Sequence, residues 1–215
     1  MFRPSPTEGA FHQGEILSDI AEVVVIPNSL GSSDLQFEEI MHPFGVILTQ
    51  ECDLDWDFKA RMAGDSNSAK ICPNALLCEL FPEEVIRPKL PRGSELWRRV
   101  KQNQEERYYA IPQAPAGADL EQAGLPLLIA DFKQLFAIRT DELYARIAHG
   151  LKRRTVIQIP WVQDLSNRVG YYLQRVAIPD GEQTPVARPI PLAARTSSRS
   201  EAILAKIRGF IGFSD

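Results

Sequence analysis

The chain has 215 residues, of which 44% are hydrophobic and 24% charged, and its net charge at pH 7 is −4. This length fits one large domain or a domain with an appendage, and the composition argues against disorder of the whole chain. The negative net charge gives no general argument for nucleic-acid binding.

The charges are unevenly distributed. Met1 to Asp57 contain eleven acids and one base, whereas the remaining residues have a net charge of +6. Such asymmetry is typical of a basic surface that meets an anionic partner, or of two halves of one fold that neutralise each other. The second arrangement is the more common.

No apolar run approaches the ~18 residues that cross a bilayer, and the N-terminus lacks the apolar segment of a signal peptide. Three cysteines do not make a disulfide framework. We therefore expect a cytoplasmic protein with free thiols and no membrane association. The sequence gives no indication of its oligomeric state.

In chain order, the first ten residues contain proline, serine and glycine and predict a flexible arm. A barrel-type domain is expected over 11–178. Short helices are predicted at 54–63, before Gly64, and at 94–103, with Ser94 as the N-cap. Residues 140–142 predict a turn or cap. Apolar and β-branched runs predict strands at 11–17, 21–26, 44–50, 70–81, 107–111, 125–130 and 135–139. The strand at 70–81 is interrupted at Pro73.

The strongest helix pattern spans 161–176, with Pro160 at its first position. Trp161, Leu165, Val169, Tyr172 and Val176 recur at helical spacing and predict one face that packs on the core. Residues 179–215 predict a Pro-rich linker and then a C-terminal amphipathic helix that docks on its own domain or on a partner. Many short strands followed by helices predict a mainly β fold with helical additions (α+β), built on a small β-barrel.

The central feature of the sequence is the apolar strand Phe44 to Leu48, which ends in a run of reactive polar side chains. A buried strand commonly presents functional groups at its end. Thr49, Gln50, Cys52 and Asp53 are therefore the candidate catalytic residues.

The combination of Gln13-Gly14-Glu15-Ile16 with Thr49 to Leu54 resembles a group of uncharacterised bacterial proteins that carry a Ser/Thr-Gln-x-Cys-Asp-Leu/Ile signature. Residues 175–179, at the end of the predicted helix, also resemble the corresponding sequence of that group. This resemblance implies no particular reaction. More distantly, the Gly-acid-Ile entry resembles the SH3-like barrel of MazF/PemK-type toxins, which cleave RNA; their Arg-Pro is here His42-Pro43.

Cys52 could act as a nucleophile if a base lowered the pKa of its thiol, and the histidines of the chain are His12, His42 and His149. The neighbouring Asp53 would instead raise that pKa, because a carboxylate disfavours a nearby thiolate. The alternatives are that Cys52 packs as a small hydrophobic residue and that Asp53 caps a helix.

The sequence predicts no metal and no cofactor. Cys52, Cys72 and Cys78 lack the spacing of a zinc knuckle, and the alternating acids at 53, 55 and 57 lack the glycine of a calcium loop. No phosphate-binding loop, dinucleotide fingerprint or hydrolase elbow occurs.

Basic residues form two short clusters that could follow an RNA backbone, with Tyr108 and Tyr109 near the first of them for base stacking. The alternative is a solvated helix face. The candidate nucleic-acid-binding residues are Arg98, Arg99, Lys101, Arg153 and Arg154.

These observations predict a binding or regulatory module on an SH3-like barrel, with a small ligand or protein partner near Gln50, Cys52 and Asp53. The alternative is an enzyme, either a toxin-like endoribonuclease or a Cys-dependent hydrolase that uses Cys52.

Overall fold

The computed structural model describes residues 1–26, 30–31, 34–65, 69–90 and 94–175. The chain divides into two compact units, Met1–Arg175 and Val176–Asp215, and the described residues belong to the first. The linker and helix predicted over 179–215 lie outside the described residues. Within the described part, no helix has the length and apolar character needed to cross a membrane.

The described residues form a mixed α+β fold of seven strands and five α-helices, which confirms the predicted class. The strands are β1 (Phe2–Pro4), β2 (Glu15–Val25), β3 (Phe37–Ile47), β4 (Asn74–Pro82), β5 (Tyr108–Ile111), β6 (Leu128–Arg139) and β7 (Lys152–Ile157). The helices are α1 (Glu51–Met62), α2 (Glu83–Ile86), α3 (Ser94–Lys101), α4 (Thr140–Ile147) and α5 (Trp161–Leu173).

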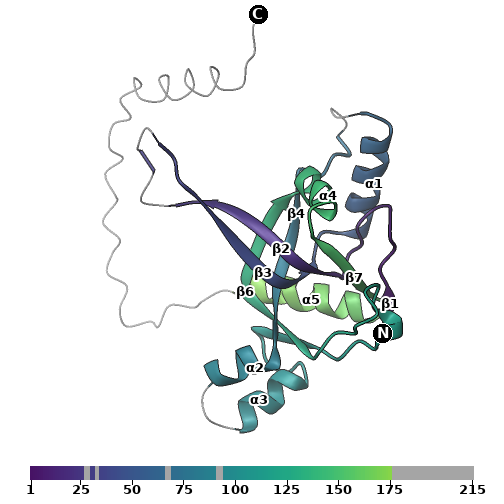
Figure 1. Cartoon of the computed structure of the whole chain (residues 1–215). Helices are drawn as coiled ribbons and strands as arrows, with labels where there is room; N and C mark the ends of the chain where they lie inside the picture. Colours follow the sequence, from purple (N-terminus) through teal and green to yellow (C-terminus); the bar gives the residue numbers. More distant parts are fainter. Residues whose placement is uncertain (27–29, 32–33, 66–68, 91–93, 176–215) are drawn as a thin grey trace, which may run out of the picture. The chain divides into compact units, whose positions relative to one another are not determined.

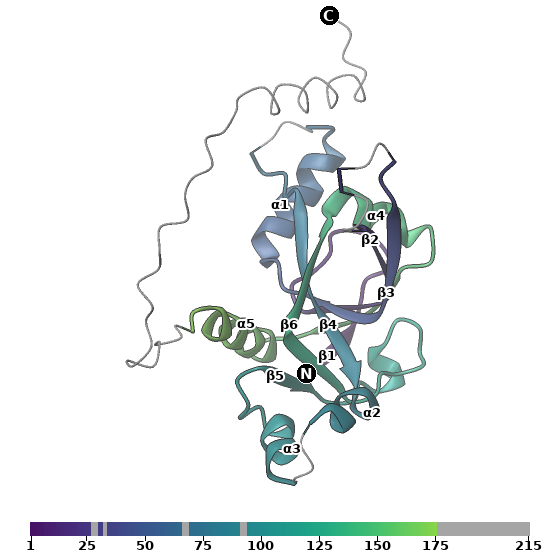
Figure 2. The same ribbon diagram turned by 90° about the vertical axis from the view of Figure 1, so that its left-hand side faces the viewer.

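The strands make one antiparallel sheet in the order β1-β7-β2-β3-β4-β6-β5 (Figures 1 and 2). The predicted central strand from Phe44 lies in β3, which occupies the middle of the sheet. The end strands β1 and β5 do not pair with each other, so the sheet is open and the predicted closed barrel is wrong. The sheet can bury its apolar surface without closing into a barrel, because helices pack on it.

The first residues differ from the predicted flexible arm. Phe2, Arg3 and Pro4 pair with Ile157, Val156 and Thr155 of β7. The N–H of Ser5 donates to the carbonyl of Arg154 at 3.3 Å. A three-residue strand has too little periodicity to be found in the sequence, and only its long-range partner reveals it.

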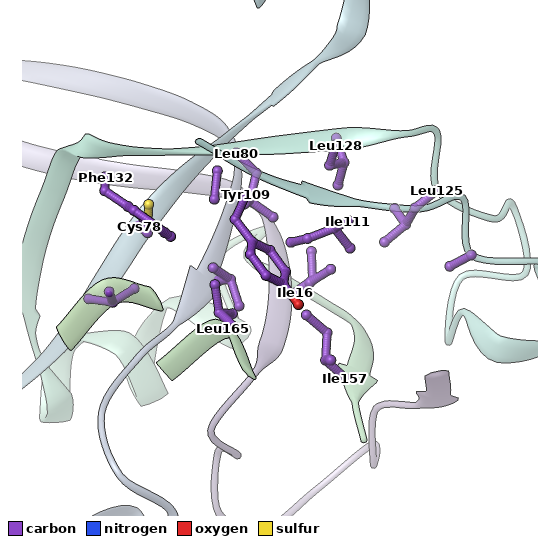
Figure 3. Close-up of a cluster of buried hydrophobic side chains, with 14 residues drawn as sticks. Ile16, Cys78, Leu80, Tyr109, Ile111, Leu125, Leu128, Phe132, Ile157 and Leu165 are labelled. Carbon is purple, nitrogen blue, oxygen red and sulfur yellow. The ribbon is translucent and has the colours of Figure 1, made fainter. Parts of the chain in front are cut away.

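Three apolar clusters hold the helices on the sheet. In the first, Leu165 and Val169 of α5 pack with residues of β2, β4, β5 and β6, among them Ile16, Leu80 and Tyr109 (Figure 3). The predicted core face of this helix is confirmed at Leu165 and Val169, although Trp161 is 46% exposed. The second cluster joins α1 and α4 to Leu17 and Ile47, and the third joins α2 and α3 to β5.

Candidate functional site

Polar side chains from five segments surround a cavity of about 510 Å³, which we call the His12 cleft. Its polar lining comes from β1, the loop before β2, the start of α1, the segment after β7 and α5. Its apolar wall comes from β7, the segment after β7 and α5. The lining residues are Arg3, His12, Gln13, Glu51, Gln158 and Gln163, with Val156, Ile157, Ile159 and Val162 as the wall.

The loop before β2 approaches α5 closely because it contains Gly14. This residue has a φ of +77°, in the region that favours glycine. A Cβ there would lie 2.7 Å from Cγ2 of Val162. The N–H of Gly14 donates to the carbonyl of Ile47 at 2.8 Å, and the N–H of Ile157 donates to the carbonyl of Gly14 at 3.0 Å. Gly14 thus fixes the loop against both β7 and α5.

Glu51, the first residue of α1, holds His12 in place. The Nδ1 of His12 lies 2.6 Å from Oε1 of Glu51, and the N–H of Gln13 donates to Oε2 at 2.8 Å. A carboxylate in the first turn is also favoured by the helix dipole. Since the carboxylate accepts at Nδ1, the Nε2 of His12 is the imidazole nitrogen left for a ligand.

A buried ion pair between Glu15 and Arg153 holds the same loop on β7. The N–H of His12 donates to Oε2 of Glu15 at 2.9 Å. Arg153 donates to both oxygens of Glu15, at 2.6 and 2.9 Å, and to the carbonyls of Gly9 and Ala10. The side chains of Arg153 and Glu15 are 2% and 0% exposed, respectively. The loop is therefore tied to β7 through charges that have no access to water.

Arg3 supplies a cation to the cleft. It lines the cavity from β1, opposite Val156 of β7. No carboxylate of the described residues lies within 4.0 Å of its guanidinium. A guanidinium presents a planar fork of donors that fits a carboxylate or a phosphate.

The four predicted catalytic residues do not line the His12 cleft. The hydroxyl of Thr49 accepts the N–H of Leu76 at 2.8 Å, and Gln50 is the N-cap of α1. The thiol of Cys52 is exposed, 3.8 Å from Oε1 of Gln50 and 3.7 Å from Oδ1 of Asp53. These neighbours are acceptors, and among the described residues no histidine lies within hydrogen-bond distance of this sulfur. A nucleophilic role for Cys52 remains a prediction.

The group that sequence reasoning missed is the pair of His12 and Glu51. The sequence indicates His12 only as a possible base for Cys52, and Glu51 lies within the predicted run at 49–53. The signal that could have found the pair is the turn at Gly14, which brings His12 back toward the end of β3.

The other two cysteines are poor nucleophiles. Burial raises the pKa of the Cys78 thiol far above its ordinary value, and burial also raises the pKa of Cys72. A raised pKa leaves less of the reactive thiolate at neutral pH. In the part of the chain that the structure describes, no group of three His, Cys, Asp or Glu side chains is arranged to hold a metal ion.

The five predicted RNA-binding residues do not share one surface. Arg98, Arg99 and Lys101 lie exposed on α3, where Arg98 pairs with Glu95 at 2.6 Å. Arg153 and Arg154 are buried in β7. The Arg154 guanidinium donates to both oxygens of Asp119, at 2.9 and 2.7 Å. Arg153 neutralises Glu15 of the acidic N-terminal part, in agreement with the second interpretation of the uneven charge. Arg154 pairs with Asp119, which belongs to the basic remainder of the chain.

No model of a known protein family matches the chain, and no curated protein sequence matches it significantly. The resemblances to the bacterial group with the Cys-Asp signature and to MazF/PemK-type toxins therefore remain predictions.

Proposed function

We propose that the protein is a binding module that holds a small ligand with an oxyanion group in the His12 cleft. The observation that carries this proposal is that Arg3 and His12 line one cavity, while the Arg3 guanidinium and the Nε2 of His12 have no ion-pair or hydrogen-bond partner among the described residues. Small-ligand sites in proteins are typically cavities with apolar walls and a few convergent polar groups. The His12 cleft has this composition.

The chemistry of the lining indicates the ligand class. Arg3 pairs with a phosphate or carboxylate, and His12 donates or accepts one further hydrogen bond. The amides of Gln158 and Gln163 can satisfy both donors and acceptors. Ile157, Ile159 and Val162 provide apolar contact for the body of the ligand. The proposed ligand is therefore a small phosphorylated or carboxylated molecule with an apolar portion.

Replacing Arg3 with glutamine is expected to weaken oxyanion binding about tenfold or more, because a hydrogen bond to a charged group contributes roughly 1.5–3 kcal/mol. The measurement is an NMR titration of the ¹⁵N-labelled full chain with inorganic phosphate and, separately, with succinate. The amides of Gln13, Gly14 and Val156 should shift.

Arg98→Gln on α3 is the matched control, since it removes the same charge from an exposed surface. Equal weakening by Arg98→Gln and Arg3→Gln would indicate general charge attraction and contradict the proposal. Absence of shifts with both anions at millimolar concentration would contradict it too. A response to phosphate alone assigns a phosphorylated ligand, whereas a response to succinate alone assigns a carboxylated one.

A second candidate function is RNA cleavage, which the contact between His12 and Glu51 favours. A histidine held by a carboxylate through Nδ1 is a common general base. In this reaction Nε2 of His12 takes the proton of a ribose 2′-hydroxyl. The 2′-oxygen attacks the adjacent phosphorus at the same time. The bond to the 5′-oxygen breaks, that oxygen takes a proton from water, and a 2′,3′-cyclic phosphate remains. Arg3 would stabilise the charge on the phosphoryl oxygens.

For this candidate, His12→Ala is expected to slow cleavage of a single-stranded RNA oligonucleotide by about 10²–10⁴-fold. Cys52→Ser should leave the rate unchanged, and a DNA oligonucleotide of the same sequence should stay intact because it lacks the 2′-hydroxyl. Loss of activity in Cys52→Ser would instead support the Cys-dependent enzyme. An inactive wild-type protein rules out the RNA-cleaving candidate and leaves the binding proposal to its own test.

A further inference from the structure

The far part of the β2–β3 hairpin has two unpaired edges. Residues 20–25 of β2 pair with 37–42 of β3, and we call this segment the β2–β3 ribbon. β7 pairs with β2 only as far as Ser18, and β4 pairs with β3 only from Phe44. Figure 1 shows the ribbon extending past both neighbours. Along the ribbon, half of the backbone N–H and C=O groups of each strand therefore point outward, with no described strand beside them.

One face of the ribbon carries four exposed apolar side chains, Val23, Val25, Phe37 and Met41. On this face Val25 is the cross-strand partner of Phe37, and Ala21 is that of Met41. Val23 lies between them opposite Glu39, whose carboxylate is 3.9 Å from the guanidinium of Arg146. Val23 is 54% exposed, Phe37 62% and Met41 56%. Single exposed apolar side chains are ordinary, but a contiguous group of them on one surface marks an interaction site.

The opposite face carries Glu22 and Glu38 beside Val24 and Ile40. Residues 19–41 contain five carboxylates and no lysine, arginine or histidine. Glu22 and Glu38 lie on the face opposite Val23 and Val25, because their partners are Ile40 and Val24. Glu38 is exposed and has no described ion-pair partner, whereas Glu22 contacts His42 at 3.1 Å. Two such acidic ribbons would repel each other, which argues against a second copy as the occupant.

We infer that the β2–β3 ribbon is a docking site for an extended segment of a protein partner in which basic and apolar residues alternate. Such a segment adds a strand to a free edge through backbone hydrogen bonds. Because successive side chains of a strand point to opposite faces, its apolar residues extend the face of Val23 and Phe37. Its lysine or arginine residues then lie on the face of Glu38.

The test uses a fluorescein-labelled peptide of alternating lysine and valine, with binding to the full chain followed by fluorescence anisotropy. Phe37→Ser should weaken binding about tenfold, as expected for loss of an aromatic anchor, and Glu38→Lys should weaken it similarly. Matched controls are Leu173→Ser and Glu84→Lys, which change an exposed leucine of α5 and an exposed acid of α2. Both controls should bind as the wild type does.

Two further peptides separate the contributions of the apolar side chains and of the backbone hydrogen bonds to binding. A lysine–serine repeat keeps the charge and loses the apolar side chains, and an N-methylated lysine–valine repeat loses the backbone donors. Both should bind much more weakly than the lysine–valine peptide. Equal binding of the lysine–serine peptide, or no binding of the lysine–valine peptide, overturns the inference. A dimer in sedimentation experiments that Phe37→Ser dissociates would also overturn it, because the ribbon would then be a self-association surface.

Discussion

Replacing Arg153 with methionine is expected to lower the free energy of unfolding by about 3–5 kcal/mol, since removal of one partner leaves the other as an uncompensated buried charge. That charge is Glu15, whose side chain is 0% exposed. Methionine keeps much of the arginine stem's volume, so the lost energy reports mainly on the ion pair and on the donors to Gly9 and Ala10. Urea denaturation followed by tryptophan fluorescence measures the change.

The double variant Glu15→Gln/Arg153→Met provides the control. It removes both charges together, so much of the lost stability should return, because replacement of a whole buried pair is often nearly neutral. Arg98→Met, at an exposed pair on α3, should have little effect. If Arg153→Met is as mild as Arg98→Met, the pair with Glu15 does not hold the loop at 12–15.

The sequence predicted strands and helices well where their signal is local. The β3 strand from Phe44 and the apolar face of α5 at Leu165 follow from short-range periodicity. The sequence does not predict β7, because its residues Lys152 to Arg154 are typical of a basic surface cluster. The carboxylate that makes Arg153 an interior residue is Glu15, 138 positions earlier in the chain. Contacts between residues so far apart in the chain leave no local pattern in the sequence. Strand pairing of the same kind decides whether a sheet closes into a barrel.

Of the run at 49–53, the residue that lines the His12 cleft is Glu51 and none of the four predicted catalytic residues. The helix was expected to begin at Leu54, and it begins at Glu51. Successive residues of a helix differ by about 100° in direction. The starting residue therefore decides which side chain of the run at 50–53 meets the loop before β2. Glu51 reaches His12, while Cys52 points to neighbours within its own turn.

Replacing Gly14 with alanine is expected to destabilise the protein by roughly 2–5 kcal/mol. A left-handed backbone costs a non-glycine residue about 1–2 kcal/mol, and overpacking typically costs about 1–3 kcal/mol. The new Cβ would lie 2.7 Å from Cγ2 of Val162 and 3.3 Å from the carbonyl oxygen of Ile157. Because those neighbours belong to the wall of the His12 cleft, phosphate binding should weaken even where the variant stays folded.

Gly64→Ala separates the cost of the left-handed backbone from the cost of overpacking. Gly64 has a φ of +72°, close to the +77° of Gly14, and a Cβ there would meet nothing within 4 Å. This variant should show only the backbone cost and should bind phosphate as the wild type does. The difference between the two urea midpoints then measures the contact of the loop with α5 and β7. Equal destabilisation by both substitutions would mean that α5 moves aside freely, and the cleft would not depend on the close approach at Gly14.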